Sequence, residues 1–294
     1  MTSDTRIWLC NMISEFVKNS PENSLMMETE EKAWEDNVLI GFSSGSDRLY
    51  EDYKNLVGEL HWTPHEIFTL TFPDAAVNPA DLSVISWVLL QRETTKADNR
   101  QENFYPSRRW IHARFPGEEF NNSLRRHIVR ELSKIGIKAV APVITPQWSW
   151  EKSPKYVFTS RWSERHAAYA AGLGTFGLCD GLITVKGKAH RVGSVVANLA
   201  VPATTRPYEN HHAYCLFFFD GSCTGCRKRC PVGAISEKGH DKLKCWDHAV
   251  LICGNYVKEN YGFDGYGCGL CQTAVPCESG IPRKIRKRLD ELSS

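Results

Sequence analysis

Cysteine is the residue type in this sequence whose number and spacing point most directly to chemistry. The chain has 294 residues and 11 cysteines, and nine of these lie between Cys215 and Cys277. An odd number of cysteines argues against a disulfide framework, and thiolates are soft ligands that suit iron–sulfur clusters and zinc. The C-terminal third of the chain is therefore predicted to bind metal.

The first group of cysteines has the spacing of a ferredoxin. In bacterial ferredoxins the run is C-x2-C-x2-C-x3-C-P, and its fourth cysteine ligates the other of two clusters. Here Cys223, Cys226 and Cys230 occupy the last three positions, and Pro231 follows them. Because structural zinc sites rarely carry this Cys-Pro ending, the spacing predicts an iron–sulfur cluster.

Asp220 stands at the first position of this run, where a cysteine is expected. A carboxylate is a harder and weaker ligand for iron than a thiolate, so an iron atom held by Asp220 would be labile. Two alternatives stay open. Either Cys215 takes the place of Asp220, or the cluster contains three iron atoms and Asp220 is a turn residue.

The second group of cysteines departs from the ferredoxin spacing, because five residues instead of three precede its last cysteine. Upstream of it lie two candidates for a further ligand. If each group lends its last cysteine to the other cluster, the chain binds two 4Fe-4S clusters. The first cluster takes Cys223, Cys226, Cys277 and Asp220, and the second takes Cys230, Cys268, Cys271 and either Cys245 or Cys253.

Upstream of the cysteines, Gly172-Leu-Gly174-Thr-Phe-Gly177 matches the G-x-G-x-x-G pattern of dinucleotide-binding proteins. A helix is expected before it and a strand after it, the reverse of the order that dinucleotide binding requires. The glycines therefore predict a tight helix-to-strand loop that lines a cofactor cavity. Three residues before this loop are candidates to face an anionic ligand: Arg161, Arg165 and His166.

Apolar periodicity and turn residues predict the elements that position these groups. Alternation of helices and strands favours an α/β or α+β domain over residues 1–205, followed by a smaller cysteine-rich domain over 206–294 that ends in a basic helix. Helices are expected over 1–36, from residue 48, over 120–135 and over 163–171. Strands or buried segments are expected over 38–42, 66–72, 84–90 and 138–144, and a strand pair over 182–185 and 192–201.

The composition limits the partners of the chain. Hydrophobic residues make up 42% and charged residues 24%, as in ordinary globular proteins, and the formal net charge is +2. This near-neutral charge argues against nucleic acid as a partner. There is no run of about 18 apolar residues, so no membrane span is expected. The N-terminus lacks the basic and apolar regions of a signal peptide, which predicts a cytoplasmic protein.

The segment ERHAAYAAGLG over residues 164–174, followed by the cysteine groups, resembles the epoxyqueuosine reductase and reductive dehalogenase superfamily. The resemblance implies an α+β protein in which a nitroreductase-like α/β domain precedes a small two-cluster ferredoxin-like domain. It also implies a base-off cobalamin over the loop 172–177, which receives electrons from the clusters. The expected electron donor is a ferredoxin or flavodoxin, and the expected substrate is a small molecule.

One departure from that superfamily lies before the resembling segment. Epoxyqueuosine reductases resemble one another in an Asp-x-x-Pro-x-x-Glu phrase whose Asp supplies a proton, whereas Phe158 stands six residues before Glu164 here. Queuosine chemistry on tRNA is therefore not expected. The sequence predicts an iron–sulfur oxidoreductase that passes electrons to a substrate or corrinoid held by the N-terminal domain. The alternative, supported only by the basic C-terminal helix, is a non-catalytic electron carrier or a reductive activator of a partner protein.

Overall fold

A four-stranded sheet forms the centre of the molecule. The structure is a computed structural model that describes residues 2–29 and 31–293. The strands lie in the order β1-β2-β8-β3, and all neighbours are antiparallel. Because β2 is buried along its whole length, both faces of the sheet are covered. The strands are β1 (Trp34–Ser44), β2 (Ser83–Gln91), β8 (His190–Ala197) and β3 (Ala139–Val140).

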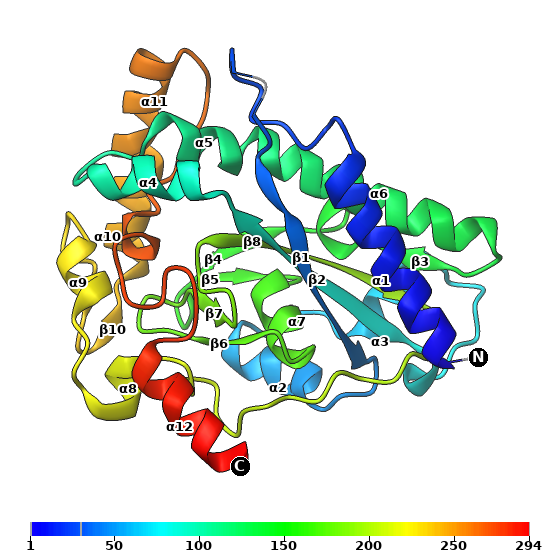
Figure 1. Cartoon of the computed structure of the whole chain (residues 1–294). Helices are drawn as coiled ribbons and strands as arrows, with labels where there is room; N and C mark the ends of the chain where they lie inside the picture. Colours follow the sequence, from blue (N-terminus) through cyan, green and yellow to red (C-terminus); the bar gives the residue numbers. More distant parts are fainter. Residues whose placement is uncertain (1, 30, 294) are drawn as a thin grey trace.

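Helices cover the two faces of the sheet (Figure 1). Alternate residues of a strand point to opposite faces, so Ile85 and Trp87 pack against α1 and α6, while Val84 packs on the other side among residues of α2, α3 and α7. The result is a three-layered domain. The helices of the first face are α1 (Thr2–Asn19) and α6 (Pro116–Lys134), and those of the second are α2 (Leu49–Leu56), α3 (Pro64–Thr71) and α7 (Glu164–Ala170).

The remaining elements surround the sheet and build the C-terminal part. In the first two hundred residues they are α4 (Glu93–Gln101), α5 (Arg108–Arg114), the hairpin β4 (Trp150–Ser153) and β5 (Val157–Ser160), the pair β6 (Gly174–Phe176) and β7 (Leu182–Thr184), and the short helices η1 (Pro79–Asp81) and η2 (Pro142–Ile144). In the C-terminal part they are α8 (Leu216–Asp220), α9 (Gly225–Arg229), β9 (Ile235–Ser236), β10 (Gly239–His240), α10 (Lys242–Trp246), η3 (Asp247–Ile252), α11 (Cys253–Tyr261), η4 (Leu270–Gln272) and α12 (Arg283–Ser293).

The C-terminal module, defined as residues 206–293 of the described chain, packs against the edge formed by β6 and β7 (Figure 1). Its apolar core includes Ile235 of the module and Ile183 of β7. The backbone N–H of Lys188 also donates to the carbonyl of Cys277 over 3.0 Å. The core therefore crosses the predicted boundary at residue 205, and the domain boundary stays a prediction.

The segment 66–72, expected as a strand or buried segment, is helical up to Thr71 in α3, and its residues Ile67 and Phe68 are buried. The Thr63 hydroxyl accepts a hydrogen bond from the Glu66 backbone N–H, and the Glu66 carboxylate accepts one from the Thr63 backbone N–H. Pro64 occupies the first helical position, where its fixed φ suits the helix and its missing N–H costs nothing. This capping box starts a helix that the apolar run alone does not reveal.

Two other expectations also fail. The first helix ends at Asn19 instead of residue 36, and β1 begins at Trp34. Strand β7 pairs with β6 and not with β8, which lies between β2 and β3. The mixed helix and sheet class is confirmed, and the expected helices over 120–135 and 163–171 lie within a few residues of α6 and α7.

Candidate metal and substrate site

Four cysteines line a narrow cavity in the C-terminal module, here called the first cysteine cavity. Cys223 and Cys226 lie just before and within α9, Cys277 follows η4, and Cys215 immediately precedes α8. Lys188, which is only 2% exposed, also lines the cavity. The cavity volume is about 20 Å³, so these side chains close on one another. Three of the four cysteines are those predicted for the first cluster.

A second and larger cavity, here called the second cysteine cavity, has a volume of about 590 Å³. The predicted ligands Cys230, Cys268 and Cys271 line it together with Cys245. The alternative ligand Cys253 contacts Cys268, but it is fully buried and is not among the lining residues. Of the two candidates, Cys245 is thus the one that shares a cavity with the other predicted ligands.

Cys179 lies where the two cysteine groups meet. It lines the second cysteine cavity, and hydrogen bonds from Cys226 and Cys271 lower the pKa of the Cys179 thiol well below its ordinary value. The Nζ atom of Lys188 donates to the Cys179 sulfur over 3.3 Å. Although burial opposes it, the charge of Cys179 raises the pKa of Lys188, so the ammonium stays charged. No spacing rule links Cys179 or Lys188 to the cysteine groups, and sequence reasoning missed both.

The two donor sets consist of cysteine thiols, the ligand type that holds iron–sulfur clusters. Over the described residues 2–29 and 31–293, no group of three or more His, Cys, Asp or Glu side chains converges on one point, as a zinc ion requires. A cluster is instead held by separate thiolates around its periphery. The second cysteine cavity has room for such a group, whereas the side chains around the first would have to move apart.

A third cavity, of about 570 Å³, adjoins the second cysteine cavity. The two share several lining residues, among them Arg114, Arg165 and Gln272. Cationic side chains outnumber carboxylates around it, so the third cavity favours a negatively charged ligand. Its lining cations are Arg114, Arg125, Arg165, Lys188 and Arg191, and its lining carboxylates are Glu118 and Glu164.

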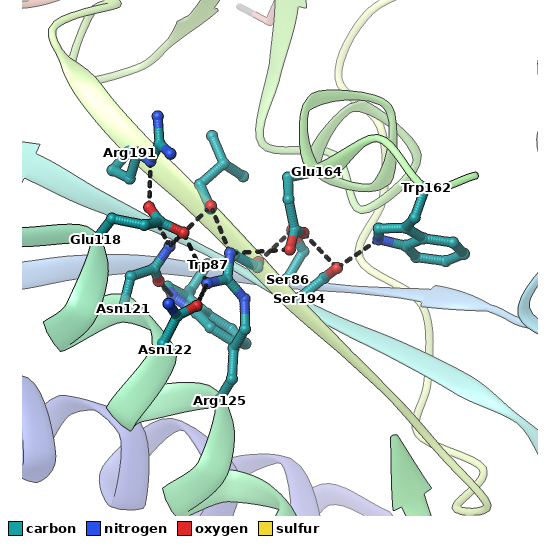
Figure 2. Close-up of polar contacts among 12 residues, drawn as sticks. Ser86, Trp87, Glu118, Asn121, Asn122, Arg125, Trp162, Glu164, Arg191 and Ser194 are labelled. Atoms are coloured by element: carbon teal, nitrogen blue, oxygen red, sulfur yellow. Dashed lines mark hydrogen bonds and ion pairs between the residues drawn. The ribbon is translucent and has the colours of Figure 1, made fainter. Parts of the chain in front are cut away.

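A buried ion-pair network forms one wall of the third cavity (Figure 2). Arg125 is 1% exposed, and its two terminal nitrogens lie 2.9 Å from Glu118 and 2.9 Å from Glu164. Ser194 of β8 donates to Glu164, and the indole N–H of Trp162 donates to Ser194 over 2.9 Å. Burial raises the pKa of Glu164 although Arg125 pairs with it. The network joins α6, α7 and β8 at the cavity.

Comparison with known proteins identifies relatives of the chain. No family model matches it. The epoxyqueuosine reductase of Bacillus anthracis is 32% identical over 131 residues, which cover 42% of this chain and 32% of that protein. That of Gloeobacter violaceus is 31% identical over 129 residues, which cover 41% of this chain and 37% of that protein. The chain is a divergent relative of these enzymes. The predicted resemblance is confirmed, and the match spans about a third of the curated relatives' length.

Solved structures share the fold. A selenomethionine-labelled epoxyqueuosine reductase aligns with a TM-score of 0.51 and 18% identity, over 96% of this chain and 68% of that one. A reductive dehalogenase whose structure was related to B12-dependent dehalogenation has a TM-score of 0.50 and 14% identity, over 96% of this chain and 38% of that one. An epoxyqueuosine reductase in complex with a modified tRNA stem loop has a TM-score of 0.50 and 16% identity, over 98% and 69%.

The tRNA complex corrects one step of the sequence argument. A protein with this fold binds RNA, so the near-neutral charge of the present chain does not by itself argue against a nucleic acid partner. The search for membrane spans gave a negative result: among the helices of the described residues, none is long and apolar enough to cross a bilayer.

The three residues predicted from the sequence to face an anionic ligand, Arg161, Arg165 and His166, fall into two groups. Arg165 and His166 line the second cysteine cavity. Burial lowers the pKa of His166 well below its usual range, so its ring is neutral. Arg161 lies elsewhere: its guanidinium donates to Ser149 over 3.0 Å and lies 5.6 Å from the ring centroid of Trp62. The structure therefore brings two of these three residues to the site.

The glycines of the 172–177 loop serve close packing. A Cβ atom on Gly174 would lie 2.4 Å from the carbonyl oxygen of Ile183, and one on Gly172 would lie 3.0 Å from that of Thr205. Gly172 also has a φ of +77°, which few other residues adopt. Only Gly177 of the three lines a cavity described above, the first cysteine cavity. Neither Gly172 nor Gly174 lines a cavity described above, and the corrinoid expected over this loop stays a prediction.

Phe158 lies in an aromatic group at the second cysteine cavity. Its ring centroid is 5.1 Å from that of Trp246 and 5.9 Å from that of Trp150, and all three residues line the cavity. An aromatic side chain thus occupies the position at which the superfamily resemblance places a proton-donating Asp. Asp220, the other irregular position, pairs with Lys284 and lines neither cysteine cavity.

Proposed function

We propose that the chain is an iron–sulfur oxidoreductase that carries two 4Fe-4S clusters and passes electrons to a substrate in the adjoining third cavity. The observation that supports it is the packing of Cys226 and Cys271 against the same apolar core as Cys179, which brings the two cysteine groups together. The second cysteine cavity in turn shares its wall with the cation-lined third cavity. Cys223, Cys226 and Cys277 hold the first cluster, and Cys230, Cys245, Cys268 and Cys271 hold the second.

The clusters, when bound, supply electrons one at a time, and the residues of this chain bind and orient the acceptor. Arg114 and Arg165 belong to both the second and the third cavity, which favours an acceptor with a carboxylate or phosphate near the clusters. The Nδ1 atom of His166 lies 2.7 Å from the Ser163 hydroxyl, which fixes the ring at the cavity wall. A ferredoxin or flavodoxin is the proposed electron donor.

A corrinoid is part of this proposal because a relative by fold is described in terms of B12-dependent chemistry. Its place is the joined second and third cavities rather than the glycine loop. Each cavity alone, at about 590 and about 570 Å³, lies within the range of ordinary small-ligand pockets. A molecule as large as a corrinoid therefore needs both, with Arg165 and His166 as contacts.

The test is a cofactor inventory of the full chain purified without oxygen. We expect about eight iron atoms and about eight sulfide ions per chain, and an electron paramagnetic resonance signal after dithionite reduction. Cys226→Ser and Cys271→Ser should each lose iron, while the control Cys10→Ser, a cysteine on α1, should not. Zinc in place of iron, or unchanged iron in both ligand variants, would refute the proposal. Co-elution with hydroxocobalamin and a changed corrinoid spectrum would support the corrinoid.

A second candidate is reduction of a modified nucleoside within RNA, which the tRNA-bound neighbour favours. Phe158 argues for the small-molecule substrate over the RNA substrate, because a phenyl ring cannot donate a proton to a modified nucleoside. Gel-shift titration of the iron-loaded chain with tRNA stem loops measures the affinity for RNA. Binding that competes with small anions would favour the RNA substrate, and absence of binding would remove it.

A further inference from the structure

The first cysteine cavity contains one cysteine more than the motif supplies. Cys215, Cys223, Cys226 and Cys277 all line it. Cys215 is 8% exposed and lies in the same apolar core as Cys277. Four thiolates are the usual complement of a four-iron cluster. The cavity therefore already has a complete set without a carboxylate.

The position of Asp220 explains why it is absent from this set. Helix α8 (Leu216–Asp220) separates Cys215 from Asp220, and it leaves Asp220 at the opposite end of the helix. There the Asp220 carboxylate accepts hydrogen bonds from the Ser222 backbone N–H over 3.0 Å and the Ser222 hydroxyl over 2.6 Å. It also pairs with Lys284 of α12. Lys284 and Ser222 lower the pKa of Asp220 to about 2.

The contacts of Asp220 are those of a turn residue with a cationic partner. To act as a ligand, its carboxylate would have to leave both Ser222 and Lys284. Iron in an iron–sulfur cluster prefers thiolate to carboxylate. Because Cys215 already lines the cavity, ligation by Asp220 would not compensate for the loss of its contacts with Ser222 and Lys284.

We propose that Cys215 is the fourth ligand of the first cluster and that Asp220 is not a ligand. This inference rests on the proposed function, since it assumes that Cys223, Cys226 and Cys277 hold a cluster. On ligation the Cys215 thiol gives up its proton, as the other ligands do, and no electron is transferred. The ligand missing from the ferredoxin run is thus supplied from five residues upstream, across one short helix.

The experiment compares two variants of the full chain, Cys215→Ser and Asp220→Asn, each purified without oxygen. The measured quantities are iron and acid-labile sulfide per chain and the resonance spectra before and after reduction. We expect Cys215→Ser to lose between about one and about four of about eight iron atoms, or to show a three-iron signal when oxidised. Asp220→Asn should keep the iron content and spectra of the unchanged chain. The reverse pattern would overturn the inference.

Two further measurements separate the outcomes. Cys226→Ser is included because its ligand role belongs to the proposed function. If Cys226→Ser loses iron and Cys215→Ser does not, the inference fails and the proposed function stands; if neither loses iron, the proposed function fails. Should Cys215→Ser not fold, brief oxidation of the unchanged chain by ferricyanide decides. A cluster with four thiolates resists conversion to a three-iron form, whereas rapid conversion by about one equivalent of oxidant would overturn the inference.

Discussion

Replacing Arg125 by methionine tests the ion-pair network of Figure 2. Arg125→Met removes the cation that lies 2.9 Å from both Glu118 and Glu164. Glu118 keeps its contact with Arg191, so the carboxylate left without a cation is Glu164. Removal of one partner of a buried ion pair costs about 3–5 kcal/mol of unfolding free energy. We expect the free energy of unfolding to fall by about 3 kcal/mol, the lower end of this range, because Ser194 still donates a hydrogen bond to Glu164.

Urea unfolding of the full chain, followed by circular dichroism, measures this loss. The matched control is Arg130→Met on the same helix, because the Arg130 side chain is 60% exposed where it contacts Glu131. An exposed pair of this kind is worth about 0–1 kcal/mol. The double variant Arg125→Met with Glu164→Gln should recover much of the stability, since a neutral amide leaves no buried charge.

The pH dependence supplies a second check. Without Arg125, the folded-state pKa of Glu164 rises further above its unfolded value, because burial already raises it. The folded state then binds a proton that the unfolded state releases, so the variant loses stability as pH rises from the unfolded pKa of Glu164 to its folded pKa. Arg125→Met should therefore be closer to the unchanged chain at pH 5 than at pH 8. Equal stability of Arg125→Met and Arg130→Met at pH 8 would refute the reasoning.

Three more predictions concern buried groups around the site. Lys188→Met should lower the reduction potentials of both clusters, because a buried ammonium favours the added electron. A redox titration followed by electron paramagnetic resonance measures these potentials. The control Lys186→Met, at an exposed side chain, should leave them unchanged. Cys245→Ser should lose iron from the second cluster, whereas Cys253→Ser should keep it. If Cys253→Ser loses iron and Cys245→Ser does not, Cys253 is the ligand and the prediction is wrong. His61 is 1% exposed, and burial lowers its pKa to about 4. The free energy of unfolding should therefore fall by up to about 3 kcal/mol as pH falls from about 6.5 to about 4, because the unfolded state binds a proton that the folded state does not. Acid unfolding curves of His61→Phe should lack this decrease.

The elements that could be predicted from the sequence are those whose pattern is local and complete. Helix α6 carries Leu124, Ile128 and Leu132 at helical spacing, and all three are buried. Strand β2 is mostly apolar, interrupted only by Ser86 between its ends, because the sheet is covered on both faces. Strand β7 lies within the strand predicted over 182–185, but its pairing with β6 was missed because the three residues of β6 are too few to show a period.

The site divides in the same way. Spacing within one motif predicted that Cys223 and Cys226 belong together. Spacing left Cys215 open as an alternative to Asp220, and the fold places Cys215 in the same cavity as Cys223 and Cys226. Cys179 and Lys188 could not be found from spacing. Their role depends on the packing of the β6–β7 edge against the C-terminal module, which no local pattern of residues encodes.

The contacts across residue 205 bear on how electrons would reach a substrate. The Arg229 guanidinium, between two predicted ligands, donates to the carbonyls of Asn99 and Glu102 in the N-terminal domain, over 3.0 and 2.8 Å. Arg100 of the same segment pairs with Glu278, which is 6% exposed and follows Cys277 directly. Breaking partly buried polar contacts of this kind costs stability, because each break leaves a group without its partner. These contacts attach the C-terminal module to the part of the chain that bears the third cavity, so the proposed electron transfer would require no movement of one relative to the other.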